Sequence, residues 1–306
     1  MNLEAIQRKA SNAAIASVRI LVGLLWLANV NWKRPTEFGG NNGSGLARWI
    51  DEGIKNPVTP PYAWFLEHVV RAHLGIFGWF TLLSEALLAT LLVLGWRTRL
   101  VALGGAAMSM GIALTVLRTP NEWPWAYYLM VGAHLLLAAV GAGDHFGLDG
   151  LRRSNISLHT VWKALGGLAL VAGVAGFIAA VDNPFTAKFG SLVGSRPFEV
   201  KLFWFNTLGA LLCVLIGALG LAAGVLGNRL FALAAAALGA LASLQVLIQW
   251  RGSGPAETGG ILGGNGGTLC LWLIVAIGFG LTARTSSNLS AGTSSNVAAA
   301  KELPVS

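Results

Sequence analysis

Long apolar runs alternate with short polar segments along the whole chain, and eight of these runs have the length of a membrane-spanning helix. They cover roughly 13–31, 73–94, 99–118, 124–142, 161–181, 202–226, 229–250 and 267–283. A helix needs about 20 apolar residues to cross a hydrocarbon core of about 30 Å. The run 202–226 is long for one helix, and the run 267–283 is short. The pattern predicts an all-α integral membrane protein with about eight transmembrane helices.

The segments outside these helices have different compositions and different expected structures. The first apolar run contains Arg19 and has no small-residue cleavage pattern, so we expect a retained helix and not a signal peptide. Residues 32–72 mix apolar and charged positions, which favours short helices on or in the membrane surface. Residues 284–306 are rich in Ser, Thr, Asn and Ala, and we predict a disordered tail.

Basic residues gather in the short turns between alternate spans. These turns carry Arg97, Arg99, Arg152, Arg153 and Arg229, and an even number of spans puts them on the same side as Arg8 and Lys9. Short loops rich in Lys and Arg stay in the cytoplasm, and longer loops obey this rule less strictly. We therefore expect both termini to be cytoplasmic and residues 32–72 to lie outside.

Composition narrows the class of protein further. Hydrophobic residues make up 55% of the chain and charged residues only 11%, whereas soluble domains carry about 25% charged residues. The net charge is +8, but the basic residues stand in ones and twos at the ends of apolar runs, which argues against nucleic-acid binding. Cys213 and Cys270 lie inside apolar runs, so neither a disulfide nor a metal site is expected.

The two halves of the chain share a pattern that indicates an internal repeat. The turn that begins at Gly95 is echoed at Gly227, and each half has four spans with a long external segment after its first span. This predicts two tandem four-helix bundles, at 1–150 and 151–283, followed by the tail. In the second half Leu170 stands in place of Arg19 and Gly217 in place of Glu85, so we expect any chemistry in the first half.

Glu85 is the most informative residue, because a carboxylate inside an apolar span is costly unless it is paired or functional. Counted at 1.5 Å per residue from the inner ends of their spans, Arg19, Glu85 and His134 all fall roughly 9–15 Å above the cytoplasmic edge. We therefore predict that Arg19 pairs with Glu85 inside the first bundle and that His134 lies alongside.

Residues 15–150 contain a series of motifs in a fixed order: Arg19-x3-Gly23, Lys33, Glu85, Gly95-x-Arg97-Thr98-Arg99, Gly141-Ala142-Gly143 and Leu148-Asp149. With this series the segment resembles the DoxX/DoxD family of four-helix membrane proteins. The resemblance covers the first half and implies a four-helix bundle in a prokaryotic-type cell membrane. It also implies a link to the membrane subunit of thiosulfate:quinone oxidoreductase or to another membrane-associated oxidoreductase.

Two roles for Arg19, Glu85 and His134 stay open at this point. In the first, they form a quinone head-group or proton site, since a histidine and a carboxylate can supply the hydrogen bonds and protons that quinone reduction needs. In the second, Arg19 and Glu85 are an ion pair that fixes helix packing, and His134 bonds to a neighbouring group. The sequence thus favours a membrane component of a redox system that uses quinone or supports an oxidoreductase partner. The alternatives are a non-catalytic scaffold and a small-molecule transporter.

Overall fold

The computed structural model of the protein describes residues 3–33, 35–152, 157–180, 188–193, 200–249 and 261–301. In these ranges the long helices are α1 (Leu3–Val30), α4 (Leu74–Leu94), α5 (Thr98–Val116), α6 (Pro124–Val140), α7 (Leu158–Ala180), α8 (Thr207–Leu226), α9 (Arg229–Gln249) and α10 (Gly266–Lys301). All except α6 are long and apolar enough to cross a membrane, and α6 is a shorter apolar helix of 17 residues. The chain is therefore an all-α multi-pass membrane protein in its described part, apart from one β-hairpin.

The hairpin is the first departure from the sequence-based prediction. Strand β1 (Lys188–Val193) pairs antiparallel with β2 (Val200–Phe205), with Lys188 opposite Phe205 and Val193 opposite Val200. The run 202–226 was predicted as one span, which is wrong for its first residues. It contains the end of a strand rich in aromatic and β-branched residues, and then α8. The Asn206 side chain, which accepts a hydrogen bond from the Gly209 amide at 3.0 Å, marks the start of α8.

A second departure lies at the other end of the chain. Helix α10 continues to Lys301, through most of the segment that the sequence predicts as disordered. Residues 286–301 contain no proline, the residue that most strongly interrupts a helix, so a helix that has already formed can extend through them. Residues 302–306 of the predicted tail lie outside the described residues.

The segment after α1 forms short helices, as its mixed pattern indicated. It contains α2 (Gly45–Lys55), α3 (Pro60–Phe65) and a π-helical stretch, η1 (Leu66–Arg71). Helix α2 packs against α5 and η1, and Gly53 permits the contact because a Cβ there would lie 2.5 Å from the Thr115 carbonyl oxygen. At the opposite end of the bundle, two 3-10 turns, η2 (Ala142–Asp144) and η3 (Leu148–Arg152), follow α6. We call these two ends the loop end and the turn end.

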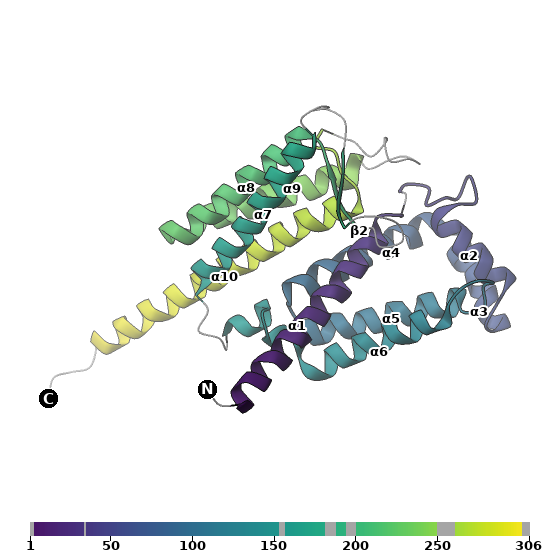
Figure 1. The fold of residues 1–306 in the computed structure, drawn as a ribbon, viewed down its shortest axis with the longest axis horizontal. Coiled ribbons are helices and arrows are strands. Elements are labelled where there is room, and N and C mark those ends of the chain that lie inside the picture. The colour runs from purple at the N-terminus through teal and green to yellow at the C-terminus, as the bar shows by residue number, and fades with distance from the viewer. Residues whose placement is uncertain are drawn as a thin grey trace.

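The long helices form two groups that meet along α10 (Figure 1). Helices α1, α4, α5 and α6 make one group, and α7, α8, α9 and α10 make the other. Small residues let the helices approach closely: a Cβ at Gly23 of α1 would lie 2.8 Å from Val93 Cγ2 of α4. Helix α10 packs on α9 and α7, and also on α4 and α1 of the first group. It therefore buries one flank of the α1–α4 pair.

Candidate functional site

Glu85 lies in the middle of α4 and forms an ion pair with Lys33. Its Oε2 atom is 2.8 Å from Lys33 Nζ, and both side chains are 1% exposed. Its Oε1 atom accepts a hydrogen bond from Asn29 Nδ2 at 3.0 Å. The prediction that Arg19 is the partner of Glu85 is therefore wrong, and the compensating charge comes from Lys33.

The antiparallel register of α1 and α4 explains this choice of partner. Gly23 of α1 sits against Ala89 and Val93 of α4. Six residues further along α1, Asn29 reaches the level of Glu85, because the two helices run in opposite directions. Arg19 lies about 15 Å from that level, beside the turn that follows α4. The depth of Arg19 was counted from residue 13, the start of the apolar run. This count placed Arg19 at the wrong level, because α1 begins at Leu3 and extends past the end of α4.

A chain of polar contacts connects the buried pair with the surface of α1. Asn29 Oδ1 accepts a hydrogen bond from Trp32 Nε1 at 2.7 Å, and Lys33 Nζ lies 3.5 Å from the centroid of the Trp32 ring. Asn29 is half-buried and follows the exposed Leu25 by four residues, so it lies at the edge of the exposed face of α1. One hydrogen bond therefore separates the Glu85 carboxylate from a residue at the lipid-facing surface.

The start of α10 closes the same region from the other group of helices. The Gly267 amide donates a hydrogen bond to Asn31 Oδ1 at 2.6 Å, and a Cβ at Gly266 would lie 2.6 Å from Val30 Cγ1. Asn265 caps the helix by accepting from the Thr268 amide at 2.9 Å. Residues 263–270 are all buried. The second half of the chain thus covers part of a site that the sequence placed entirely in the first half.

Arg19 belongs to a separate cluster at the turn end. It is buried, and its Nη2 donates to the Phe146 carbonyl oxygen at 2.9 Å. Its guanidinium lies against Gly95 and Gly147, where a Cβ would come within 1.6 Å and 2.1 Å of Nη1. Gly95 also has a φ of 65°, a left-handed conformation that glycine adopts without strain. The Arg19–Gly95 contact therefore fixes the middle of α1 against the end of α4.

The remaining residues of the family motif organise the start of α5. The Asp149 carboxylate accepts hydrogen bonds from the backbone amides of Arg97 at 2.6 Å and Thr98 at 2.8 Å. The Asp149 amide donates to the Gly95 carbonyl at 2.9 Å. Arg97 stacks on the Trp96 ring, and Arg99 lies beside Gly141. Asp149 therefore acts as an N-cap supplied from more than fifty residues away.

His134 lies in a third environment, between α1, α5 and α6. It is 1% exposed, and its Nε2 accepts a hydrogen bond from Trp26 Nε1 at 2.8 Å. Its Nδ1 lies 2.7 Å from the Met130 carbonyl oxygen. With one nitrogen accepting and the other donating, the ring is neutral and carries its proton on Nδ1. No hydrogen bond or ion pair joins it to Arg19 or Glu85 among the described residues.

Sequence reasoning therefore found Glu85 but missed most of its surroundings. The sequence places Lys33 among the motif residues but does not pair it with Glu85. The signal for that pairing is its position four residues after Asn29, which brings both side chains to the same side of the chain. No sequence signal indicated the approach of α10. Within the described ranges, no three His, Cys, Asp or Glu side chains lie close enough together to hold a metal ion.

Comparison with known proteins places the first half of the chain in a family. A family model described as TQO small subunit DoxD matches residues 15–171, just over half of the chain. The match contains Arg19, Lys33, Glu85 and Asp149 and ends inside α7. No curated protein and no solved structure matches the chain.

Proposed function

Because the chain belongs to the DoxD family, we propose that it is the membrane subunit of a quinone-linked oxidoreductase. The family description names a small subunit of such an enzyme, which implies a partner subunit that supplies electrons. The apolar helices give the chain access to the lipid phase, where a quinone with its apolar tail resides. In a prokaryotic cell this phase is the cell membrane, and the basic turns favour cytoplasmic termini.

Within this function, the quinone head group is proposed to bind beside Glu85, Lys33 and Asn29. Reduction of a quinone needs donors to its two carbonyl oxygens and, with two electrons, two protons. Lys33 and the Asn29 amide are donors. The Glu85 carboxylate can take up a proton and pass it to a carbonyl oxygen, once for each of the two protons, while the partner subunit supplies the two electrons. The observation that best supports this site is the position of Asn29. It bonds to the buried Glu85 carboxylate, and it is half-buried at the edge of the exposed face of α1.

One observation favours the alternative of a non-catalytic scaffold. Glu85 and Lys33 satisfy each other and are 1% exposed, as expected of an ion pair that only fixes α1 against α4. In that case the chain would anchor its partner subunit without touching quinone. The two functions differ in whether neutral replacements at this site remove bound quinone while the fold is kept.

The test compares matched variants purified in mild detergent with their native lipids. Glu85→Gln/Lys33→Gln removes both charges together and retains hydrogen-bonding groups, so neither charge is stranded. We expect it to keep a folded thermal transition and to lose co-purified quinone, measured by extraction and chromatography. Glu67→Gln, at an exposed carboxylate with a 60% exposed side chain, is the control and should keep quinone. Full quinone retention in the double variant would reject the site.

The wider proposal has its own test. An affinity-tagged chain should co-purify with an oxidoreductase subunit, and deletion of the chain should lower electron transfer from that enzyme to membrane quinone. If no redox enzyme accompanies the chain and quinone reduction is unchanged by deletion, the assignment to a quinone-linked oxidoreductase fails. A retained partner with a quinone-free chain would favour the scaffold.

A further inference from the structure

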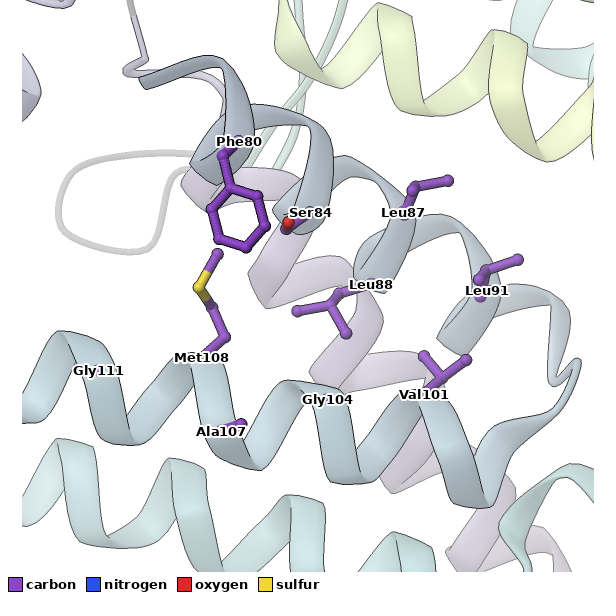
Figure 2. Close-up of a pocket in the computed structure, with 10 residues that line it drawn as sticks. All are labelled: Phe80, Ser84, Leu87, Leu88, Leu91, Val101, Gly104, Ala107, Met108 and Gly111. Atoms are coloured by element: carbon purple, nitrogen blue, oxygen red, sulfur yellow. The ribbon is translucent and has the colours of Figure 1, made fainter. Parts of the chain in front are cut away.

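An apolar groove lies between α4 and α5, away from the polar site. It has a volume of about 530 Å³. Its walls are Phe80, Ser84, Leu87, Leu88 and Leu91 on α4, and Val101, Gly104, Ala107, Met108 and Gly111 on α5 (Figure 2). Ser84 is the only lining residue with a polar side chain. Phe80, Leu87 and Gly104 are exposed, so the groove opens on the surface that faces lipid.

The groove exists because α4 and α5 meet at the turn and diverge from it (Figure 2). Leu91 and Val101 lie at its narrow end, whereas Phe80 and Met108 point toward each other at its far end. On the α5 side the floor is made of small residues. A Cβ at Gly104 would meet no atom within 4 Å, so this position is empty and not filled by a neighbour.

The dimensions of the groove fit one hydrocarbon chain of one leaflet. The α4 wall runs from Leu91 to Phe80, which is about 16 Å at 1.5 Å per residue. Half of a hydrocarbon core of about 30 Å is about 15 Å. Because Leu91 lies three residues before the end of α4, the groove starts near the headgroups on the turn end and reaches toward the membrane centre.

A cation stands at the headgroup end of the groove. Arg97 is the N-cap residue of α5 and precedes the lining residue Val101 by four positions, so it stands at the turn end of the groove. The Arg97 side chain is exposed and stacks on Trp96, and no salt bridge to it is found in the described part of the chain. The nearby Asp149 carboxylate accepts hydrogen bonds from the amides of Arg97 and Thr98. Arg97 is thus placed to meet an anion at the level of the lipid phosphates.

We propose that the α4–α5 groove binds an anionic phospholipid from the leaflet at the turn end, with one acyl chain between the helices and its phosphate on Arg97. The apolar walls match the acyl chain, the length matches one leaflet, and Arg97 and Trp96 match a charged headgroup at the interface. This site is independent of the quinone proposal, because Glu85 bonds to Asn29 of α1 and to Lys33, and none of these three residues lines the groove.

The test uses the full chain in detergent micelles, titrated with phosphatidylglycerol or phosphatidylcholine and observed by native mass spectrometry. Gly104→Leu places a side chain in the groove at a position where the added Cβ meets no atom within 4 Å. Its matched control is Gly132→Leu on α6, where a Cβ likewise meets nothing within 4 Å. Arg97→Gln removes the cation, and Arg97→Lys retains it. Arg229→Gln, at the corresponding turn of the second half, is the control for the loss of one exposed charge.

The wild type is expected to retain one phosphatidylglycerol through detergent washing and to prefer it to phosphatidylcholine. Gly104→Leu should abolish this retention, and Arg97→Gln should weaken it about fivefold, the effect of one basic residue near an anionic membrane. Arg97→Lys and both controls should retain the lipid. Equal retention of the two lipids, or equal losses in Gly104→Leu and Gly132→Leu, would overturn the proposal. The proposal would also be overturned if the Gly104→Leu variant lost bound quinone but still retained phosphatidylglycerol.

Discussion

Breaking the Glu85–Lys33 pair costs much stability, because substitution of either residue leaves the charge of the other buried and unpaired. The carboxylate and the ammonium group are 2.8 Å apart with side chains 1% exposed, and Asn29 supplies the second contact to Glu85. Removal of one member of a buried pair costs roughly 3–5 kcal/mol, whereas replacement of both by apolar groups is often close to neutral. The coupling between the two positions therefore distinguishes a true pair from two independent polar residues.

We expect Glu85→Leu and Lys33→Leu each to lower the free energy of unfolding by about 3–5 kcal/mol, and the double variant to recover much of that loss. Denaturant or thermal unfolding in detergent measures the cycle. As a matched comparison, Arg19→Leu combined with Glu85→Leu should be additive, because no contact joins these residues. Coupling between Arg19 and Glu85 would contradict the register of α1 and α4.

At the turn end, Gly95 should tolerate no side chain. A Cβ would fall 1.6 Å from Arg19 Nη1, and the φ of 65° costs an L-residue about 1–2 kcal/mol even without a clash. Gly95→Ala is therefore expected to destabilise the fold by more than this backbone cost. Gly104→Ala, at an uncrowded helical position, should be neutral or slightly stabilising in the same unfolding experiment. Equal stability of the two variants would rule out the close approach of Arg19.

At the scale of elements, the lengths of the apolar runs predict most of the helices. They do not predict where one element ends and the next begins. The run 202–226 contains both a strand end and a helix, and only Asn206, a good helix N-cap, indicates the boundary. Depth estimates assumed that each span starts where its apolar run starts. Helix α1 begins at Leu3, so its register against α4 is set by the Gly23 contact and cannot be read from run lengths. This is why Glu85 was identified as a candidate while its partner was not.

The start of α5 depends on a residue that follows α6. Asp149 accepts from two backbone amides that no intrahelical partner can satisfy. We expect Asp149→Ala to lower stability by about 0.5–2 kcal/mol, the usual cost of a lost N-cap, as measured by unfolding. Asp149→Asn keeps one acceptor oxygen and should lose less. If both variants lose nothing, water must replace the cap without cost.

For the whole molecule, the repeat in the sequence predicts two tandem bundles, and the long helices of the described part form two groups of four. The first two and the last two helices of each group pack together, as α1 with α4 and α7 with α8. Yet α10 also packs on α4 and α1, which no local sequence pattern specifies. Long-range contacts of this kind depend on the shape of both surfaces, so the sequence predicted two bundles and not the interface between them.

Separate expression of the two halves tests how far they depend on each other. We expect residues 1–150 and 151–306, produced together as separate chains, to co-purify in mild detergent through the α10 interface. The fragment 1–150 alone should have a lower unfolding midpoint than in the complex, because the α4 and α1 surfaces under α10 become exposed. Fragments that separate fully and melt at unchanged temperatures would instead support two independent bundles.

The proposed orientation can be measured directly by cysteine labelling, because the native Cys213 and Cys270 are buried and should give little background. Asn42→Cys, in the segment after α1, should react with a membrane-impermeant maleimide added to intact cells. Lys9→Cys, on an exposed position near the start of α1, should react only after the membrane is permeabilised. Labelling of Lys9→Cys from outside would reverse the assigned topology.

The hydrogen bond from Gly267 to Asn31 joins residues 236 positions apart, and this has a consequence for the order of biosynthesis. At about 5–20 residues per second, the start of α10 leaves the ribosome roughly 10–50 s after Asn31. Glu85 and Lys33 can meet early, but during that interval their flank is covered only by lipid or by insertion machinery. Nascent chains that stall before α10 should therefore carry an incompletely enclosed charge pair and be preferred substrates for membrane proteases.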